Sequence, residues 1–176
     1  MINAGQFLIK PIDIDDLAPF YSMIERNRER LKAFFPGTVS RTLTQEATRN
    51  FILENNQKRS EKTYFSFVVI NTENQDFVGY LDLKNIVWDL PKAEMGFFMD
   101  EMYAHKGFTT QIFQAFCDYC MKEMGFIKLF LRTHESNTSA CHLAQKCGFQ
   151  LEGTIRNDHR TTDGAVVDLL YFGKIT

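Results

Sequence analysis

The sequence contains no run of apolar residues long enough to cross a membrane. No window approaches the roughly 18 consecutive apolar residues that a membrane span requires. The N-terminus, MINAGQFLIKPIDIDDL, lacks a basic segment followed by an apolar core, so we expect no signal peptide, no membrane partner and a cytoplasmic location. Repeats, low-complexity tracts and linkers are absent as well. The 176 residues suit one domain, residues 1–176, with a full core.

The chain also lacks an excess of charge of either sign. It has 20 Lys and Arg residues against 22 Asp and Glu residues, which gives a formal net charge of −2 at pH 7. Proteins that bind the phosphate backbone of a nucleic acid carry a basic surface, so we expect no nucleic-acid partner. The charge balance leaves open a small phosphorylated ligand.

The four cysteines lack the spacing of a metal site. Cys117 and Cys120 have the CxxC spacing, but both fall on the apolar face of an expected helix, and Cys141 and Cys147 lie in a later helix. No histidines complete a zinc-like set. We therefore expect reduced, buried thiols and no metal. A thiol-redox role for Cys117 and Cys120 is an alternative.

Apolar and aromatic residues are plentiful, with 44% hydrophobic residues and 17 Phe. Apolar periodicity predicts strands at residues 7–11, 63–70, 77–83, 93–99, 128–133, 149–155 and 166–172. It predicts helices at residues 13–32 and 45–58, from about 107 to 124, and at 139–146, with an apolar turn at 34–37 and a loop at 85–91. This order predicts an α/β (α+β) domain with a mixed, mostly antiparallel, twisted sheet of about seven strands and about four helices. One parallel crossover should run through residues 93–133.

The stretch from Asp100 to Met124 follows a strand and opens its helix with Lys106-Gly107-Phe108-Thr109-Thr110. At such a helix N-terminus, free backbone N–H groups and the positive end of the helix dipole point to the same place, which favours an anion. A single glycine before a helix is common, so this motif is specific only together with the two described next.

Three motifs resemble those of the GNAT superfamily of acyl-CoA-dependent N-acetyltransferases, over nearly the whole chain. Ala93-Glu-Met-Gly-Phe-Phe98 is similar to the family's AEIGYW strand, and residues 104–110 are similar to its pyrophosphate loop. The segment from Asn137 to Phe149, followed by Glu152-Gly153, resembles its N-x-x-S…K-x-G-F…EG motif. The chain looks most like the branch that acetylates the N-termini of ribosomal proteins.

The resemblance implies a sheet that splays at its centre, after a bulge within residues 94–99, and binds acetyl-CoA as a co-substrate in the opening. Backbone groups of Phe98 and Met99 would pair with the pantetheine arm. Asn137 would bind that arm or the attacking amine, although an Asn before a helix is equally typical of an N-cap. The pyrophosphate would be held by the loop residues Ala104, His105, Lys106, Gly107, Phe108, Thr109 and Thr110. Ala104 stands where the family has Gln or Arg, and His105 where glycine is frequent.

The catalytic residues are less well defined by the resemblance. Glu94 is one candidate base and His159, beside Asp158, is another; a structural carboxylate and a surface histidine are the alternatives. Ala140 and Ala144 stand where relatives carry the acid that protonates the leaving thiolate. That proton would come from Ser139, after a local register shift, or from water.

The implied reaction is direct transfer of an acetyl group from acetyl-CoA to a primary amine in a ternary complex. We expect the acceptor to be the N-terminal α-amine of a (ribosomal) protein, bound in a groove lined by residues 27–36 and the loop of Trp88. A small polyamine-like amine is an alternative acceptor, and a non-catalytic acyl-CoA-binding domain is an alternative to the enzyme. The sequence leaves open a homo-oligomer formed through an exposed sheet edge.

Overall fold

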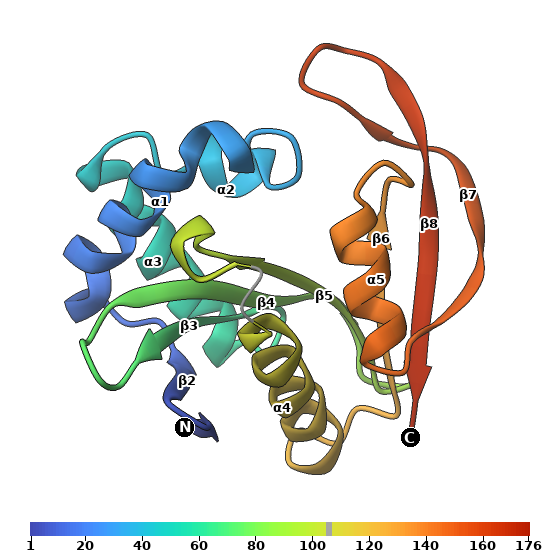
Figure 1. Cartoon of the computed structure of the whole chain (residues 1–176), viewed down its shortest axis with the longest axis horizontal. Coiled ribbons are helices and arrows are strands. Elements are labelled where there is room, and N and C mark those ends of the chain that lie inside the picture. The colour runs from blue at the N-terminus through green and yellow to red at the C-terminus, as the bar shows by residue number, and fades with distance from the viewer. Residues whose placement is uncertain (105–106) are drawn as a thin grey trace.

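The strands form one strongly bent sheet with helices packed on it (Figure 1). The computed structural model describes residues 1–104 and 107–176, in which the sheet has eight strands in the order β1-β2-β3-β4-β5-β6-β8-β7. The strands are β1 (Ile2–Ala4), β2 (Phe7–Pro11), β3 (Phe65–Asn71), β4 (Phe77–Val87), β5 (Lys92–Met99), β6 (Lys128–Thr133), β7 (Gln150–Arg160) and β8 (Val166–Ile175). The α-helices are α1 (Leu17–Leu31), α2 (Pro36–Ser40), α3 (Gln45–Ser60), α4 (Phe108–Lys122) and α5 (Thr138–Lys146).

The predicted fold class is confirmed. All neighbouring strands in the described residues pair antiparallel except β5 and β6, which are parallel because α4 crosses over between them. Four details differ from the prediction. The three-residue β1 was missed, since so short a segment has no readable alternation. Residues 36–40 form a helix instead of a turn, because Pro36 at its first position is already set for helical geometry. β4 continues to Val87, and both strands of the last hairpin are longer than predicted.

The two faces of the sheet bury two separate clusters of side chains. Alternate residues of a strand point to opposite faces, so the even-numbered residues Tyr80 and Phe98 pack with α1 and α3. The odd-numbered residues Leu81 and Met95 pack with α4 on the other face. Helices α1 to α3 therefore cover one face of β4 and β5, and α4 covers the opposite face.

The sheet splays between β5 and β6, as expected. The two strands pair at three positions, the last of which joins Glu94 and Phe130, and both then continue without pairing with each other. Figure 1 shows the result, in which β6 and β8 run steeply away from β4 and β5. The expected bulge within residues 94–99 is absent. The register of β5 with β4 is continuous there, and the shift lies between Lys84 and Val87.

Three of the four cysteines, Cys117, Cys120 and Cys147, are buried as predicted, and Cys141 is half-buried. Cys117 and Cys120 are fully buried on α4, and all four thiols are free. Burial raises the pKa of the Cys117 thiol to about 12, which leaves little reactive thiolate at neutral pH. Within residues 1–104 and 107–176, no helix is both long and apolar enough to cross a membrane.

Candidate active site

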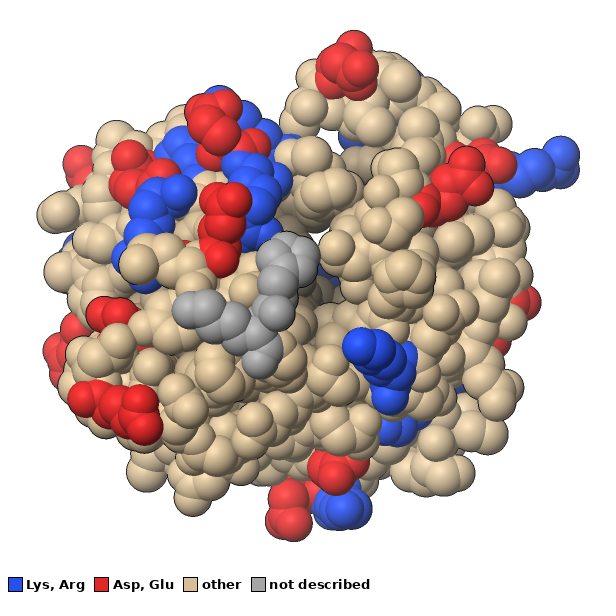
Figure 2. Space-filling model, in the orientation of Figure 1, with Lys and Arg blue, Asp and Glu red and all other residues tan. Residues whose placement is uncertain are grey.

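A cavity of about 620 Å³ lies where β5 and β6 separate. One wall comes from the α1–α2 connection, α3 and β4, and the other from β6, the start of α5 and the β7–β8 hairpin. Figure 2 shows a notch in the surface between the α1–α2 side of the molecule and that hairpin. The cavity thus joins segments from most of the chain.

The backbone of β5 presents hydrogen-bonding groups to the splay. The Asp100 N–H donates to the Val78 carbonyl at 2.7 Å. Because the backbone N–H and C=O groups of successive residues point to opposite sides of a strand, those of the even-numbered β5 residues point toward β4. The groups of Phe98 therefore point to β4, and those of Phe97 and Met99 point to the gap. The Met99 carbonyl already accepts a hydrogen bond from a guanidinium of α1. Phe97, which sequence reasoning did not select, thus takes the place expected for Phe98.

The N-terminus of α4 has the geometry of an anion cradle. Gly107 is its N-cap, at φ +80°, a conformation that favours glycine, and no side chain of residues 1–104 and 107–176 caps the helix. Phe108 packs edge-on against Phe7, with ring centroids 5.0 Å apart, so its side chain anchors the helix and only its backbone is available to a ligand. The hydroxyl-bearing residues 109–110 are half-buried in the first turn. Ala104 ends the preceding turn. The predicted contacts at His105 and Lys106 lie outside the described residues.

Asn137 lies at the end of the cavity and also caps α5. Its side-chain oxygen accepts from the Ala140 N–H at 3.3 Å, so the N-cap alternative is realised, while the residue still lines the cavity. Ser139 is exposed and is not among the described residues that line the cavity. Ser136 does line it, and its hydroxyl is 2.7 Å from Nδ1 of His134.

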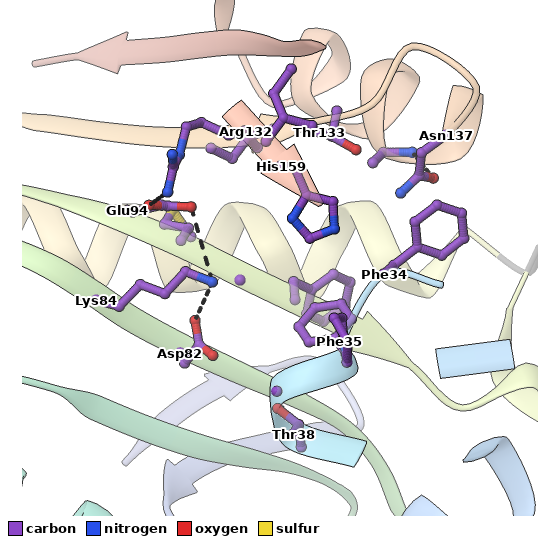
Figure 3. A pocket seen from close by; sticks show the side chains of 18 of the residues that line it. Phe34, Phe35, Thr38, Asp82, Lys84, Glu94, Arg132, Thr133, Asn137 and His159 are labelled. Atoms are coloured by element: carbon purple, nitrogen blue, oxygen red, sulfur yellow. Dashed lines mark hydrogen bonds and ion pairs between the residues drawn. The ribbon is translucent and has the colours of Figure 1, made fainter. Parts of the chain in front are cut away.

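Glu94 belongs to a network of charges that spans the base of the splay (Figure 3). One of its oxygens accepts from Asn85 at 2.6 Å and from the Arg132 guanidinium at 2.8 Å, and the other is 4.0 Å from Lys84 Nζ. The same guanidinium donates to Asp158 at 2.6 Å. Glu94 is 4% exposed, and its contacts tie β4, β5, β6 and β7 together. These contacts favour the alternative of a structural carboxylate, and a role of Glu94 as base stays a prediction.

Asp82 lies beside this network on β4 and is 3% exposed. One carboxylate oxygen accepts from the Tyr64 hydroxyl at 2.9 Å, which in turn is 2.9 Å from the Tyr80 hydroxyl. Burial raises the pKa of Asp82, while Lys84 and the Tyr64 hydrogen bond oppose the rise. Burial also raises the pKa values of both tyrosines, which therefore remain protonated donors. Asp82 is thus a buried carboxylate that accepts from one uncharged hydroxyl, that of Tyr64, and has Lys84 Nζ 4.0 Å from its other oxygen.

His159 lines the cavity from β7, half-buried, and points into it in Figure 3. Its neighbour Asp158 is engaged elsewhere, with the guanidinium of β6. Phe34 and Phe35 line the opposite wall, as predicted for the groove. Trp88 does not belong to the described lining: its indole N–H donates to the Lys62 carbonyl and its ring stacks on a phenylalanine after α4.

Sequence reasoning missed several residues of the cavity wall, of which Asn55, Asp82 and Arg132 are the most informative. Asn55 and Asp82 are polar residues at positions where the periodicity is apolar, whereas Arg132 lies on the same face of its strand as Lys128, where a charge gives no signal. Asn55 lies on the predicted buried face of α3, and Asp82 interrupts the apolar strand 77–83. A polar residue on a buried face was the available signal.

Comparison with known proteins agrees with this geometry. Residues 6–150 match the model of the acetyltransferase (GNAT) domain family. The uncharacterized N-acetyltransferase p20 of Bacillus licheniformis is 24% identical over 106 residues, covering 60% of this chain and 59% of that protein. The chain therefore spans less than two thirds of that relative's length.

The fold is also shared with solved structures. The ribosomal-protein-S5-alanine acetyltransferase of Vibrio fischeri superposes with a TM-score of 0.88 at 20% identity, covering 97% of this chain and 93% of that one. The ribosomal L7/L12 α-N-protein acetyltransferase RimL, in complex with coenzyme A, gives 0.89 at 17% identity, covering 99% and 97%. At such identities the likeness concerns the fold. The family match covers most of the chain, and the chain belongs to the GNAT acetyltransferase family.

Proposed function

We propose that the protein transfers an acetyl group from acetyl-CoA to the α-amine of a peptide or protein N-terminus, by direct attack in a ternary complex. The observation that carries this proposal is the cavity at the β5–β6 splay, which opens beside unpaired strand backbone. The similarity of the fold to ribosomal-protein acetyltransferases favours a protein acceptor, as does a groove wall of Phe34 and Phe35.

The residues present fit acetyl-CoA. The N–H of Phe97 points into the gap as an added strand would require, and the uncapped N-terminus of α4, after Gly107, suits a pyrophosphate. Acetyl-CoA supplies the acetyl carbon: the amine forms a C–N bond as the C–S bond breaks, the amine loses a proton and the thiolate gains one.

His159 is the group that we assign to accept the amine proton. It lines the cavity, and no hydrogen bond to another described residue occupies its ring. Glu94 is less suited, because its oxygens already meet Asn85, Arg132 and Lys84. An α-amine has a pKa near 8, so a histidine is a sufficient base at neutral pH, by the usual values for these groups.

Ser136 is the group that we assign to protonate the leaving thiolate. It lines the cavity next to Asn137, and its hydroxyl lies 2.7 Å from Nδ1 of His134, which also accepts from the Ser136 N–H. Ser136 is exposed, so solvent water can return the proton to its hydroxyl. Ser139, the second residue of α5, is less suited because it lies outside the described lining of the cavity.

Release of free thiol from acetyl-CoA, followed with a panel of N-terminal peptides and small amines, tests the proposal. His159→Ala should lower kcat by about 10- to 100-fold, toward the low end of general-base effects because the amine is a good nucleophile. His142→Ala changes an exposed histidine of α5 and should leave the rate unchanged. Absence of thiol release with every amine, in a protein that binds CoA, would instead support a non-catalytic acyl-CoA-binding domain.

A further inference from the structure

Three buried side-chain atoms in residues 1–104 and 107–176 make no hydrogen bond, and all three belong to residues that line the cavity. They are Asn55 Nδ2, Asp82 Oδ1 and Arg132 Nε. Native proteins leave only a few per cent of buried polar groups unpaired, so such atoms gathered at one cavity point to a ligand that pairs with them. Asn55 is 1% exposed and Asp82 is 3% exposed, so both are built into the wall.

Asn55 and Asp82 lie on the acceptor side of the sheet. Asp82 shares a face of β4 with Tyr80, whose ring is 6.4 Å from that of Phe51, one helical turn before Asn55 on α3. The uncapped N-terminus of α4 lies on the opposite face. A ligand that donates from its amine to Asp82 and accepts through its carbonyl from Asn55 therefore approaches from the α1–α3 side of the sheet.

In the described cavity wall, Asp82 is the carboxylate that accepts no hydrogen bond from a cationic side chain. The described wall carries four cations (Arg41, Lys58, Lys84 and Arg132) and three carboxylates (Asp82, Glu94 and Asp158). Glu94 and Asp158 both accept from the same guanidinium. Asp82 Oδ1 makes no hydrogen bond, and Lys84 Nζ is 4.0 Å away. This balance fits one ammonium group and disfavours a polycation.

The position of Asp82 also connects it with the site of transfer. Its direct cross-strand partner is Gly96, and a Cβ at that position would stand 2.5 Å from Asp82 Oδ1. Because residue 96 is a glycine, the Asp82 carboxylate can occupy the space beside it. The next residue along β5 is Phe97, whose backbone faces the gap.

We propose that Asp82 Oδ1 and Asn55 Nδ2 form the acceptor subsite, in which Asp82 binds the ammonium and Asn55 donates to the carbonyl of one N-terminal residue. The subsite selects a single ammonium with an adjacent carbonyl, as in a peptide N-terminus, over a polyamine. This assignment rests on the proposed function and narrows its substrate class.

Calorimetric titration of the CoA-saturated protein with trialanine amide tests the assignment without turnover. n-Butylamine (an ammonium without the carbonyl), N-acetyl trialanine amide (the carbonyls without the ammonium) and spermidine are the comparison ligands. Asp82→Asn and Asn55→Ala are the test variants. Glu46→Gln and Asn56→Ala are matched controls, since both residues lie on α3 with Asn55 and neither is among the described lining residues.

We expect Asp82→Asn to weaken both trialanine amide and n-butylamine at least tenfold. Asn55→Ala should weaken trialanine amide about fivefold, the effect of one neutral hydrogen bond, and leave n-butylamine unchanged. The acetylated peptide should bind at least tenfold more weakly than the free one, and the controls should match the wild type. Unchanged trialanine amide affinity in Asp82→Asn, or spermidine binding tenfold tighter than the peptide, overturns the assignment. If Asp82→Asn fails to fold, the Asn55→Ala comparison decides alone.

Two further readings separate this assignment from the proposed function. A wild type that binds CoA and releases thiol, while both variants bind trialanine amide normally, refutes the subsite alone. A wild type that releases no thiol, but loses trialanine amide binding in Asp82→Asn, refutes the reaction and retains the subsite.

Discussion

Gly96→Ala is the perturbation that most directly tests the geometry around Asp82. A Cβ at residue 96 would lie 2.5 Å from Asp82 Oδ1, 3.0 Å from Cγ and 3.2 Å from Oδ2. Ordinary contact begins near 3.4 Å, so the nearest oxygen must retreat by about 0.9 Å. Asp82 is 3% exposed, and its other oxygen is held at 2.9 Å by Tyr64, so it has little room to move.

Two costs follow from that displacement. Overpacking a tight interior costs about 1–3 kcal/mol. A hydrogen bond to a charged group, such as the one from Tyr64, contributes about 1.5–3 kcal/mol, part of which is lost when it lengthens. Since the same movement causes both losses, we expect a total of about 2–4 kcal/mol, or a drop in Tm of about 5–15 °C for a chain of this size.

Gly173→Ala is the matched control. A Cβ there would lie 2.1 Å from an oxygen of Glu152, an apparently worse clash. The Glu152 side chain is 36% exposed and pairs only with Lys128, so it can rotate away at the cost of a surface ion pair, worth about 0–1 kcal/mol. Thermal and urea unfolding of both variants would measure the difference. Equal destabilisation by the two substitutions, or a Gly96→Ala cost below about 0.5 kcal/mol, would refute the reasoning, because a rigid Asp82 is its premise.

Four other substitutions, at three residues, separate stability from ligand binding. Burial raises the pKa of Asp82, so the folded protein favours the protonated carboxyl and loses stability as pH rises. The Tm of Asp82→Asn minus that of the wild type should therefore increase between pH 4 and pH 7. Asn137→Ala should cost about 0.5–2 kcal/mol by removing the α5 cap, and Asn137→Asp should restore stability in urea unfolding without restoring CoA affinity in calorimetry. Glu94→Gln should destabilise by about 1–3 kcal/mol in the same urea experiment, because it leaves the Arg132 guanidinium with one carboxylate partner instead of two.

The fold was predictable because its signals are local. Strand and helix periodicities and the Thr44 cap of α3 depend on residues within one or two turns of each other, and the structure has them where they were expected. The order of the three motifs along the chain then predicted the topology, through the resemblance to the GNAT superfamily. The extent of β4 and of the last hairpin was not predictable, since strand ends depend on partners far along the chain.

The candidate site was only partly predictable for the same reason. The α4 cradle and the placement of Asn137 and His159 on the cavity wall follow from motifs. The facing direction of the β5 backbone depends on register with β4, so that Phe97 rather than Phe98 faces the gap. The Glu94 network depends on the parallel pairing of β5 with β6, which brings Arg132 from 38 residues away.

The sequence leaves open whether Glu94 is a base or a structural carboxylate, and the distribution of charges over β4 and β5 favours the structural role. Glu94 accepts from three donors or cations and stabilises the base of the splay, where the two halves of the sheet part. Asp82, on the next strand, has an oxygen with no hydrogen bond in the described chain and faces the same cavity. Lys84 Nζ lies 4.0 Å from one oxygen of each carboxylate, so the difference between them lies in their hydrogen bonds. Glu94 accepts from Asn85 and Arg132, whereas Asp82 accepts from the Tyr64 hydroxyl and no cationic side chain of the described residues donates a hydrogen bond to it, so Asp82 retains more capacity to bind a ligand. Glu94→Gln should therefore lower the free energy of unfolding, while the folded variant binds the acceptor about as tightly as the wild type. Asp82→Asn should lose affinity for the acceptor, while its stability at neutral pH rises.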